Sequence, residues 1–213
     1  MSEALRIRVK DLDFHDARLR IHQGKGSKDR VVPLHPALIV PLQRHLSMVK
    51  QLHDTDLAAG YGEVHLPNAL ERKYPKAASS WAWQYVFPSQ KLSVDPRSDK
   101  TRRHHLHPST IQSAIKAAAK RAEIHKLVGP HTLRHSFATH AIENGMEIHR
   151  VKDILGHESI ETTKVYLHLS QQRGHDFDSP LESLFGQASL PFKKQVVLPD
   201  NPELNAFLGA LSP

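Results

Sequence analysis

The chain lacks cysteine, has few aromatic residues and contains no long apolar run. Without cysteine, disulfide bonds and thiolate metal sites are excluded. The apolar runs stop well short of the roughly 18 residues that a membrane-spanning helix needs. The first residues, MSEALRIRVKDLDF, contain no apolar signal region behind a basic start. Secretion is therefore not indicated, and we expect a cytoplasmic protein without a membrane partner.

The residues that are present give the chain an excess of positive charge. Lysine and arginine number 29 against 22 acidic residues, a formal net charge of +7, and 17 histidines can add to it when the pH falls below neutrality. Such an excess attracts polyanions and favours a nucleic-acid partner. The length of 213 residues is sufficient for one domain of ordinary size, or one domain with an appendage.

Apolar periodicity and turn residues predict a series of short elements. Polar and apolar residues alternate at 18–22 and 30–34, which predicts a β-hairpin whose turn, 24–29, is rich in glycine and lysine. Residues 2–9 are typical of the end of a helix, and 11–16 of a turn. Helical spacing predicts further helices at 36–53, 110–122, 131–144, 148–155 and 160–169.

Capping residues support these bounds. Ser109 and Ser159 are plausible N-caps, and Gly145 and Gly156 are good residues for the position after a helix. The stretch 54–108 is less regular, with a short helix expected within 69–83 and a short strand at 86–87. The tail, 171–213, shows little periodicity.

One segment, His131-Thr-Leu-Arg134-His135, has the residue types that hold a phosphate. His131 and Arg134 are three apart and so share one face of a helix. A guanidinium can bind two phosphate oxygens at once, a geometry that lysine does not match. The histidine can donate to the same phosphate and assist proton transfer. Alone the pattern is weak, because two exposed helix residues would also fit it.

Two downstream residues complete a set for phosphoryl transfer. His157 follows Gly156 at a helix end, and Tyr166 comes nine residues later. A tyrosine hydroxyl can attack phosphorus when cations surround it and stabilise the transition-state charge. Taken separately, the histidine could be a simple cap and the tyrosine a packing residue. The order and spacing of the four residue types favour catalysis.

These segments together resemble the catalytic domain of the tyrosine recombinase (phage integrase) family. The resemblance covers residues 1–170 and implies an α+β, mainly helical fold with a small antiparallel β-sheet at one edge. It implies site-specific DNA recombination, in which Tyr166 forms a 3′-phosphotyrosyl intermediate while His131, Arg134 and His157 hold the phosphate. The ester retains the energy of the broken bond, so neither a cofactor nor a metal is required. The implied assembly is a tetramer on two DNA sites.

Two further catalytic positions follow from the resemblance. The run GKGSKDRVVP is similar to the family's β-hairpin, whose lysine protonates the leaving 5′ oxygen, and the matching residue is Lys25. Glu3 takes the place of the acidic residue in the family's Gly-x-Arg-x-x-Glu pattern, and the arginine of that pattern would fall immediately before Met1. We therefore expect this chain alone to cleave DNA weakly or not at all.

The stretch 69–107 resembles the insert of integron integrases, which act on folded single-stranded cassette sites with extruded bases. By this resemblance His104 and His105 contact an extruded base, because aromatic and histidine planes stack on bases. Trp81 and Trp83 could instead fix the insert to the domain surface. The other residues expected at the DNA are Tyr74, Pro75, Arg102, Arg103, Lys28, Arg30 and His135.

The favoured function is integration and excision of integron cassettes, which are mobile genetic elements. A truncated, catalytically inactive DNA-binding fragment of an integron integrase is the first alternative. A type IB topoisomerase, which shares the tyrosine chemistry, is the second, and the insert argues against it. The tail 171–213 is expected to be either exchanged between protomers or disordered.

Overall fold

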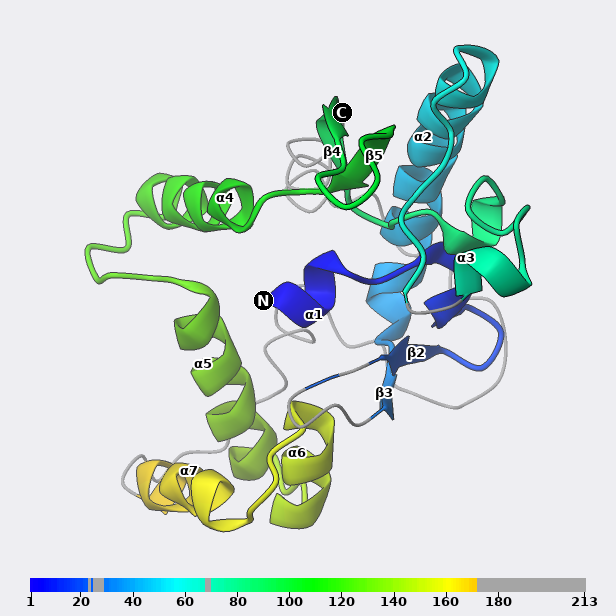
Figure 1. Ribbon diagram of the computed structural model, residues 1–213. Coiled ribbons are helices and arrows are strands. Elements are labelled where there is room, and N and C mark those ends of the chain that lie inside the picture. The colour runs from blue at the N-terminus through cyan, green and yellow to red at the C-terminus, as the bar shows by residue number, and fades with distance from the viewer. Residues whose placement is uncertain (23, 25–28, 68–69, 172–213) are drawn as a thin grey trace.

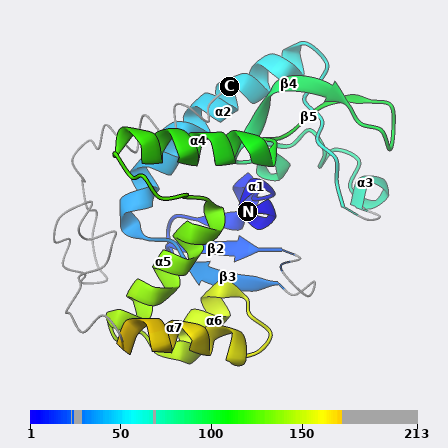
Figure 2. The ribbon, with the colours of Figure 1, turned by 90° about the vertical axis from the view of Figure 1, so that its left-hand side faces the viewer.

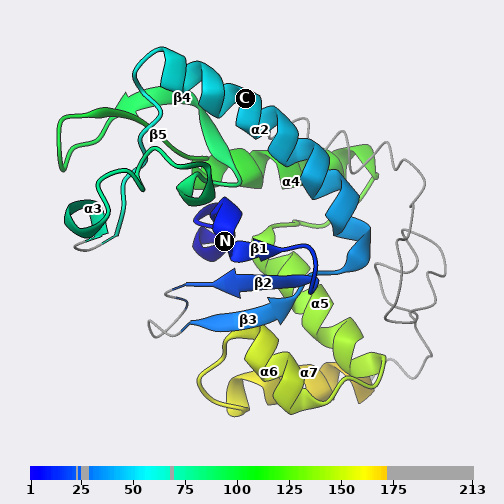
Figure 3. The ribbon, with the colours of Figure 1, turned by 90° about the vertical axis from the view of Figure 1, so that its right-hand side faces the viewer.

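The computed structural model describes residues 1–22, 24, 29–67 and 70–171. A small β-sheet lies in the middle of the molecule in both side views (Figures 2 and 3). The helices α2 (Ile39–Ala58) and α4 (Pro108–Arg121) lie above it, while α6 (Ile148–Leu155) and α7 (Glu161–Gln171) lie below it. No helix in the described ranges is both long and apolar enough to cross a membrane.

The central sheet is antiparallel and has three short strands. Strands β2 (Arg18–Ile21) and β3 (Arg30–Pro33) form the hairpin that the alternation of polar and apolar residues predicted, with Leu19 opposite Val32. A short strand, residues 12–13, lies within the segment predicted to be a turn, 11–16, and pairs with β2. The elements up to this sheet are α1 (Ser2–Leu5), a 3₁₀ helix (Val9–Asp11), β1 (Leu12–Asp13), β2 (Arg18–Ile21) and β3 (Arg30–Pro33).

Helix α2 is longer than its apolar pattern suggested. A 3₁₀ turn, Pro36–Leu38, leads into α2, which continues five residues past the predicted end at His53. His53 and Asp56 are buried on the same face as Leu46 and Val49, so polar residues extend the buried stripe beyond the apolar ones. A pattern of apolar residues alone therefore stops too early.

The insert folds around a second, two-stranded sheet. The short helix α3 (Leu70–Lys73) and a 3₁₀ turn (Trp81–Trp83) precede β4 (Pro88–Val94) and β5 (Thr101–His105), which pair antiparallel. The strand predicted at 86–87 is wrong, since β4 starts at Pro88. Val86 donates its N–H to the carbonyl of Ile7 instead, at 2.9 Å, and is buried.

Within the described residues, α5, α6 and α7 follow α4, and α5 (Pro130–Glu143) runs from the upper layer to the lower one (Figure 1). Helix α4 begins at Pro108, one residue before the predicted cap, because His107 Nδ1 accepts the N–H of Ser109 at 3.3 Å. The predicted cap at Ser159 is present, with its hydroxyl accepting the N–H of Glu161. Gly156 ends α6 in the left-handed conformation, φ +68°.

The buried residues form separate clusters. The first lies between α5, α6 and α7, the second joins Val64 and Leu66 to the insert, and the third joins α1 to the start of α4. The α5–α7 cluster consists of Ala138, Ala141, Val151, Leu155 and Tyr166. The mainly helical α+β fold expected from the sequence is confirmed, with two small sheets where one was expected.

Candidate active site

The arginine predicted to hold the phosphate is fixed to the end of a neighbouring helix. Arg134 lies on α5, half-buried, and its Nη2 donates to the carbonyl oxygen of Leu155 at 2.6 Å. Leu155 is the last residue of α6, where carbonyl groups have no partner within the helix and carry partial negative charge. Leu155 comes two residues before His157 in the sequence, so this bond fixes Arg134 at the start of the connection that carries His157.

His157 is oriented from α7. Its Nδ1 lies 2.9 Å from the hydroxyl oxygen of Thr163, which is fully buried. Its ring lies nearly parallel to that of Tyr166, with an interplanar angle of 12° and 6.4 Å between centroids. The connection between α6 and α7 therefore holds the second histidine beside the tyrosine.

Tyr166 is buried between the helices, and its hydroxyl contacts a residue of α5. It is 4% exposed and belongs to the α5–α7 cluster. Its hydroxyl oxygen lies 2.7 Å from Nδ1 of His135 on α5. His135, predicted as a DNA contact, is thus the residue that touches the hydroxyl. His131 lies one turn earlier on α5 than His135 and is exposed.

Arg30 and Glu3 form a link between distant parts of the chain. The guanidinium of Arg30 contacts both carboxylate oxygens of Glu3, at 3.1 and 2.7 Å, and its Nε donates to the carbonyl of Ile154 at 3.2 Å. Adjacent carbonyls at the end of α6 therefore accept from Arg30 and Arg134. The predicted DNA contact at Arg30 is engaged within the protein. Lys25 and Lys28 lie outside the described residues.

In the insert, two histidines and a tyrosine form a ring cluster. The rings of His104 and His105 are 4.0 Å apart, and both lie against Tyr85, at 5.5 and 5.3 Å. The guanidinium of Arg8 lies over Tyr85 and Trp83, and Lys10 Nζ is 3.7 Å from the Trp83 centroid. We call this group the His104 cluster; it consists of His104, His105, Tyr85, Trp83, Arg8 and Lys10.

The two histidines of this cluster are held in the neutral form. Burial lowers the pKa of His104 below its usual value, and the neighbouring His105 lowers it further. Burial also lowers the pKa of His105, although its hydrogen bond to the carbonyl of Leu106 opposes the effect. At neutral pH this surface therefore offers uncharged planar rings beside fixed cations.

Arg102 and Arg103 contact carboxylates of the chain itself. The Arg102 side chain is 4% exposed, and its guanidinium lies 2.6 Å from Glu71 and 3.3 Å from Asp95. Arg103 binds both oxygens of Asp56 on α2. These pairs join α3, the β4–β5 hairpin and α2, so both arginines act in the assembly of the insert rather than on its surface.

The remaining predicted insert residues lie on different surfaces. Trp81 packs near His53 of α2, with 6.0 Å between ring centroids, which matches the alternative role of fixing the insert to the domain. Tyr74 and Pro75 are exposed. Of the rings predicted to meet a base, the structure brings together Trp83, His104 and His105.

Some residues of these sites were missed by sequence reasoning. Tyr85 and Arg8 belong to the His104 cluster, and Thr163 orients His157. A signal for Tyr85 existed, because Trp81, Trp83, Tyr85 and Phe87 recur at every second position. Thr163 lies three residues before Tyr166 and so shares its helix face, but threonine alone gives no functional signal.

Comparison with known proteins agrees with this geometry. The sequence matches the phage integrase family over residues 1–173. An integrase/recombinase of Escherichia coli is 46% identical over 184 residues, which cover 86% of this chain and 55% of the relative. A tyrosine recombinase of Thermosipho africanus is 34% identical over 176 residues, covering 83% of this chain and 47% of the relative.

Among solved structures, a crystal structure of XerA recombinase aligns with a TM-score of 0.52 at 28% identity, covering 90% of this chain and 53% of that one. The chain spans about half the length of the curated relatives it matches. With a family match over most of its length, this chain belongs to the phage integrase family.

Proposed function

We propose that this chain is the catalytic part of a site-specific DNA recombinase that uses Tyr166 as its nucleophile. The observation that carries the proposal is the convergence of three helices: Arg134 from α5 is bonded to the end of α6, and His157 lies beside Tyr166 of α7. A nucleophile with adjacent phosphate-binding cations is the arrangement that phosphoryl transfer requires.

The chemistry follows from the atoms available. Arg134 binds Leu155 through Nη2, and its Nε and Nη1 have no hydrogen-bond partner among the described residues. These N–H groups are available to donate to a DNA phosphate. The hydroxyl oxygen of Tyr166 then attacks phosphorus, and the 5′ oxygen leaves. Lys25 is the proposed acid for that oxygen, and the freed 5′-hydroxyl of a partner strand reverses the step to reseal DNA.

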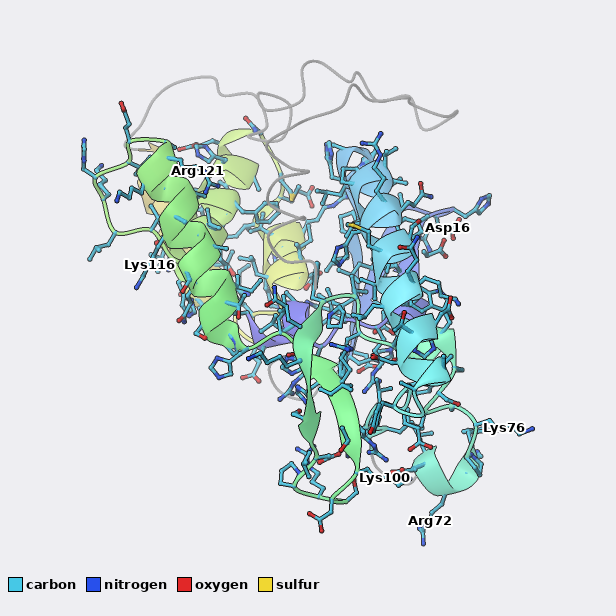
Figure 4. The ribbon with its side chains drawn as sticks, turned by 90° about the horizontal axis from the view of Figure 1, so that it is seen from above. Asp16, Arg72, Lys76, Lys100, Lys116 and Arg121 are labelled. Carbon is cyan, nitrogen blue, oxygen red and sulfur yellow. The ribbon has the colours of Figure 1, made fainter. Side chains whose placement is uncertain are left out.

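The distribution of exposed basic side chains supports DNA as the partner. Figure 4 places Lys116 and Arg121 on α4 at one end of the molecule, and Arg72 and Lys76 at the other end, on and beside α3. A DNA segment that contacts both groups would release counterions at each, so its affinity should fall steeply with salt. We propose four copies acting together on two such sites.

For the substrate, we propose a folded cassette site with extruded bases, as in integron integration and excision. The His104 cluster supports this, because the neutral imidazole rings of His104 and His105, which lie against Tyr85, can stack on an unpaired base. Lys10 beside the Trp83 ring can meet a phosphate. Arg102 and Arg103 take no part in this contact, since both are engaged with carboxylates.

Covalent trapping tests the reaction. The protein is incubated with a folded cassette site that carries a nick one nucleotide from the scissile phosphate, and the products are resolved on a denaturing gel. We expect a protein–DNA adduct that disappears in Tyr166→Phe. Salt-dependent binding without an adduct would instead identify a DNA-binding fragment that does not cleave.

A second experiment tests the substrate. The double variant His104→Ala/His105→Ala should bind a folded site about tenfold or more weakly, since stacking contributes about 1–3 kcal/mol per base. The same variant should bind a hairpin without extruded bases as the wild type does. Tyr61→Ala is the control and should bind both hairpins as the wild type does, because Tyr61 is an exposed aromatic residue outside the His104 cluster and outside the residues expected at the DNA. Equal weakening on both hairpins would contradict the extruded-base proposal.

A further inference from the structure

The hydroxyl of the nucleophile has one specific partner. His135 Nδ1 and the Tyr166 hydroxyl oxygen are 2.7 Å apart, and no other hydrogen bond of this hydroxyl occurs among the described residues. The two rings are 5.5 Å apart and inclined by 47°. A neutral imidazole with its proton on Nε2 accepts at Nδ1, so the tyrosine O–H can point at this nitrogen.

The surroundings of the pair differ on its two sides. Tyr166 is 4% exposed, whereas His135 lies in an exposed position on α5. A proton that leaves the hydroxyl of this buried residue would therefore pass to the ring of a solvent-exposed residue. The charged or titratable groups nearest the pair along the chain are His131 and Arg134, within about one turn of His135 on α5, and His157, which comes before α7 and stacks on the Tyr166 ring. Of these, only His157 has a described ring contact with Tyr166.

We propose that His135 is a catalytic residue that holds the Tyr166 hydroxyl through Nδ1 and takes its proton during attack on DNA. This inference rests on the proposed cleavage reaction. As the tyrosine oxygen bonds to phosphorus, its O–H bond breaks and the proton moves to Nδ1. The phosphorus–O5′ bond breaks at the same time, and a general acid of the site protonates O5′. Resealing reverses each change, so the imidazolium returns the proton to the tyrosine oxygen.

The decisive experiment uses a DNA substrate whose leaving group needs no general acid. A DNA strand with sulfur in place of the bridging O5′ leaves as a thiolate, which requires no protonation, so adduct formation then depends on activation of Tyr166. With this substrate in single-turnover reactions, His135→Ala should form adduct about 10²- to 10⁴-fold more slowly than the wild type at equal DNA affinity. Ser136→Ala, at an exposed neighbouring position, should match the wild type.

His135→Asn separates proton transfer from positioning. The asparagine oxygen can accept the tyrosine hydrogen bond but does not take up its proton. We expect this variant to remain as slow as His135→Ala. Recovery of the wild-type rate would reduce His135 to a positioning residue and overturn the proposal, as would faster cleavage by His135→Ala, which would mean that the bond restrains the nucleophile.

A measurement on the free protein is independent of cleavage. Nitrogen-15 NMR of labelled histidine at neutral pH should show His135 with Nδ1 unprotonated and Nε2 protonated, and Tyr166→Phe should change the Nδ1 signal. A proton on Nδ1 would make the tyrosine the acceptor and overturn the proposal. If the wild type forms no adduct even with the sulfur substrate, the proposed cleavage fails, and the NMR result still decides the direction of this hydrogen bond.

Discussion

Arg30 occupies the space that a side chain would need at residue 156. A Cβ atom built on Gly156 would lie 2.8 Å from the guanidinium carbon of Arg30, and the φ angle of +68° also disfavours any residue with a side chain. Glycine at this position therefore lets Arg30 approach the end of α6 while it binds Glu3. In this chain the Gly156-His157 pair therefore lies against Arg30 of β3.

Alanine substitutions at two glycines should distinguish the cost of backbone strain from the cost of a steric clash with Arg30. Gly145 has φ +80° with nothing within 4 Å of a Cβ, so Gly145→Ala should lower the free energy of unfolding by about 1 kcal/mol. Gly156→Ala adds the collision with Arg30 and should lower it further. Urea denaturation of both variants measures the difference. An equal loss in the two variants would show that Arg30 moves aside freely.

The Arg103–Asp56 pair should contribute far more to stability than a neighbouring pair on the same helix. The Asp56 side chain is 8% exposed, whereas Asp54, paired with Lys50, is 53% exposed. Asp56→Asn leaves a buried guanidinium uncompensated and should destabilise the fold by about 3 kcal/mol. Asp54→Asn is the matched control and should change stability by less than about 0.5 kcal/mol. Similar losses in chemical denaturation would contradict a structural role for Arg103.

Acid should weaken the fold partly through His45. This side chain is fully buried with Nε2 2.7 Å from the carbonyl of Val86, and burial lowers its pKa from the ordinary 6.5 despite that bond. The unfolded chain then binds a proton that the folded chain does not. Stability is complete above about pH 6.5 and falls as the pH decreases toward the lowered value.

Urea denaturation from about pH 7.5 to about pH 5.5 measures this decline. His45→Gln retains a donor for Val86 and removes the titrating group, so its stability should fall less steeply with acid. The same direction applies to four further histidines whose pKa is lowered chiefly by burial: His53, His65, His104 and His105. An unchanged slope in His45→Gln would assign the decline to those residues.

Two substitutions at Tyr166 should separate chemistry from packing. Tyr166→Phe keeps the ring in the α5–α7 cluster and removes a single hydrogen bond, so the free energy of unfolding should change by about 1 kcal/mol. Tyr166→Ala removes a buried ring and should destabilise by about 3–5 kcal/mol. Both should lack the covalent adduct. Thermal denaturation distinguishes them, and equal stability would mean that the ring does not support the cluster.

Local signals explain which parts of the structure could be predicted from sequence. The bounds of α6, 148–155, were correct because apolar periodicity and the terminal Gly156 act within one segment. The β2–β3 hairpin was predicted by alternation for the same reason. Strands β4 and β5 were missed, since PSQKLSV and TRRHH have little alternation and are joined to the domain by ion pairs to residues distant in sequence.

In the candidate site, too, the sequence indicated the types of residue but not which residues they contact. The order of arginine, histidine and tyrosine indicated phosphoryl chemistry, but the choice between His131 and His135 as the neighbour of Tyr166 depends on how α5 is turned toward α7. Arg30 and Arg102 were expected at DNA because a sequence cannot distinguish an arginine that meets phosphate from one that meets a carboxylate.

Because Tyr166 is buried within the α5–α7 cluster, different substitutions at position 166 should give different phenotypes in a cell that also contains active copies. Phenylalanine preserves the core and every surface of the chain, so such a copy would compete with active copies for the same partners and act as a dominant inhibitor. A small residue empties the cluster, and the unfolded copy would be degraded, a recessive loss. Substitutions at this single position should therefore give either a dominant or a recessive phenotype, depending on the size of the new side chain.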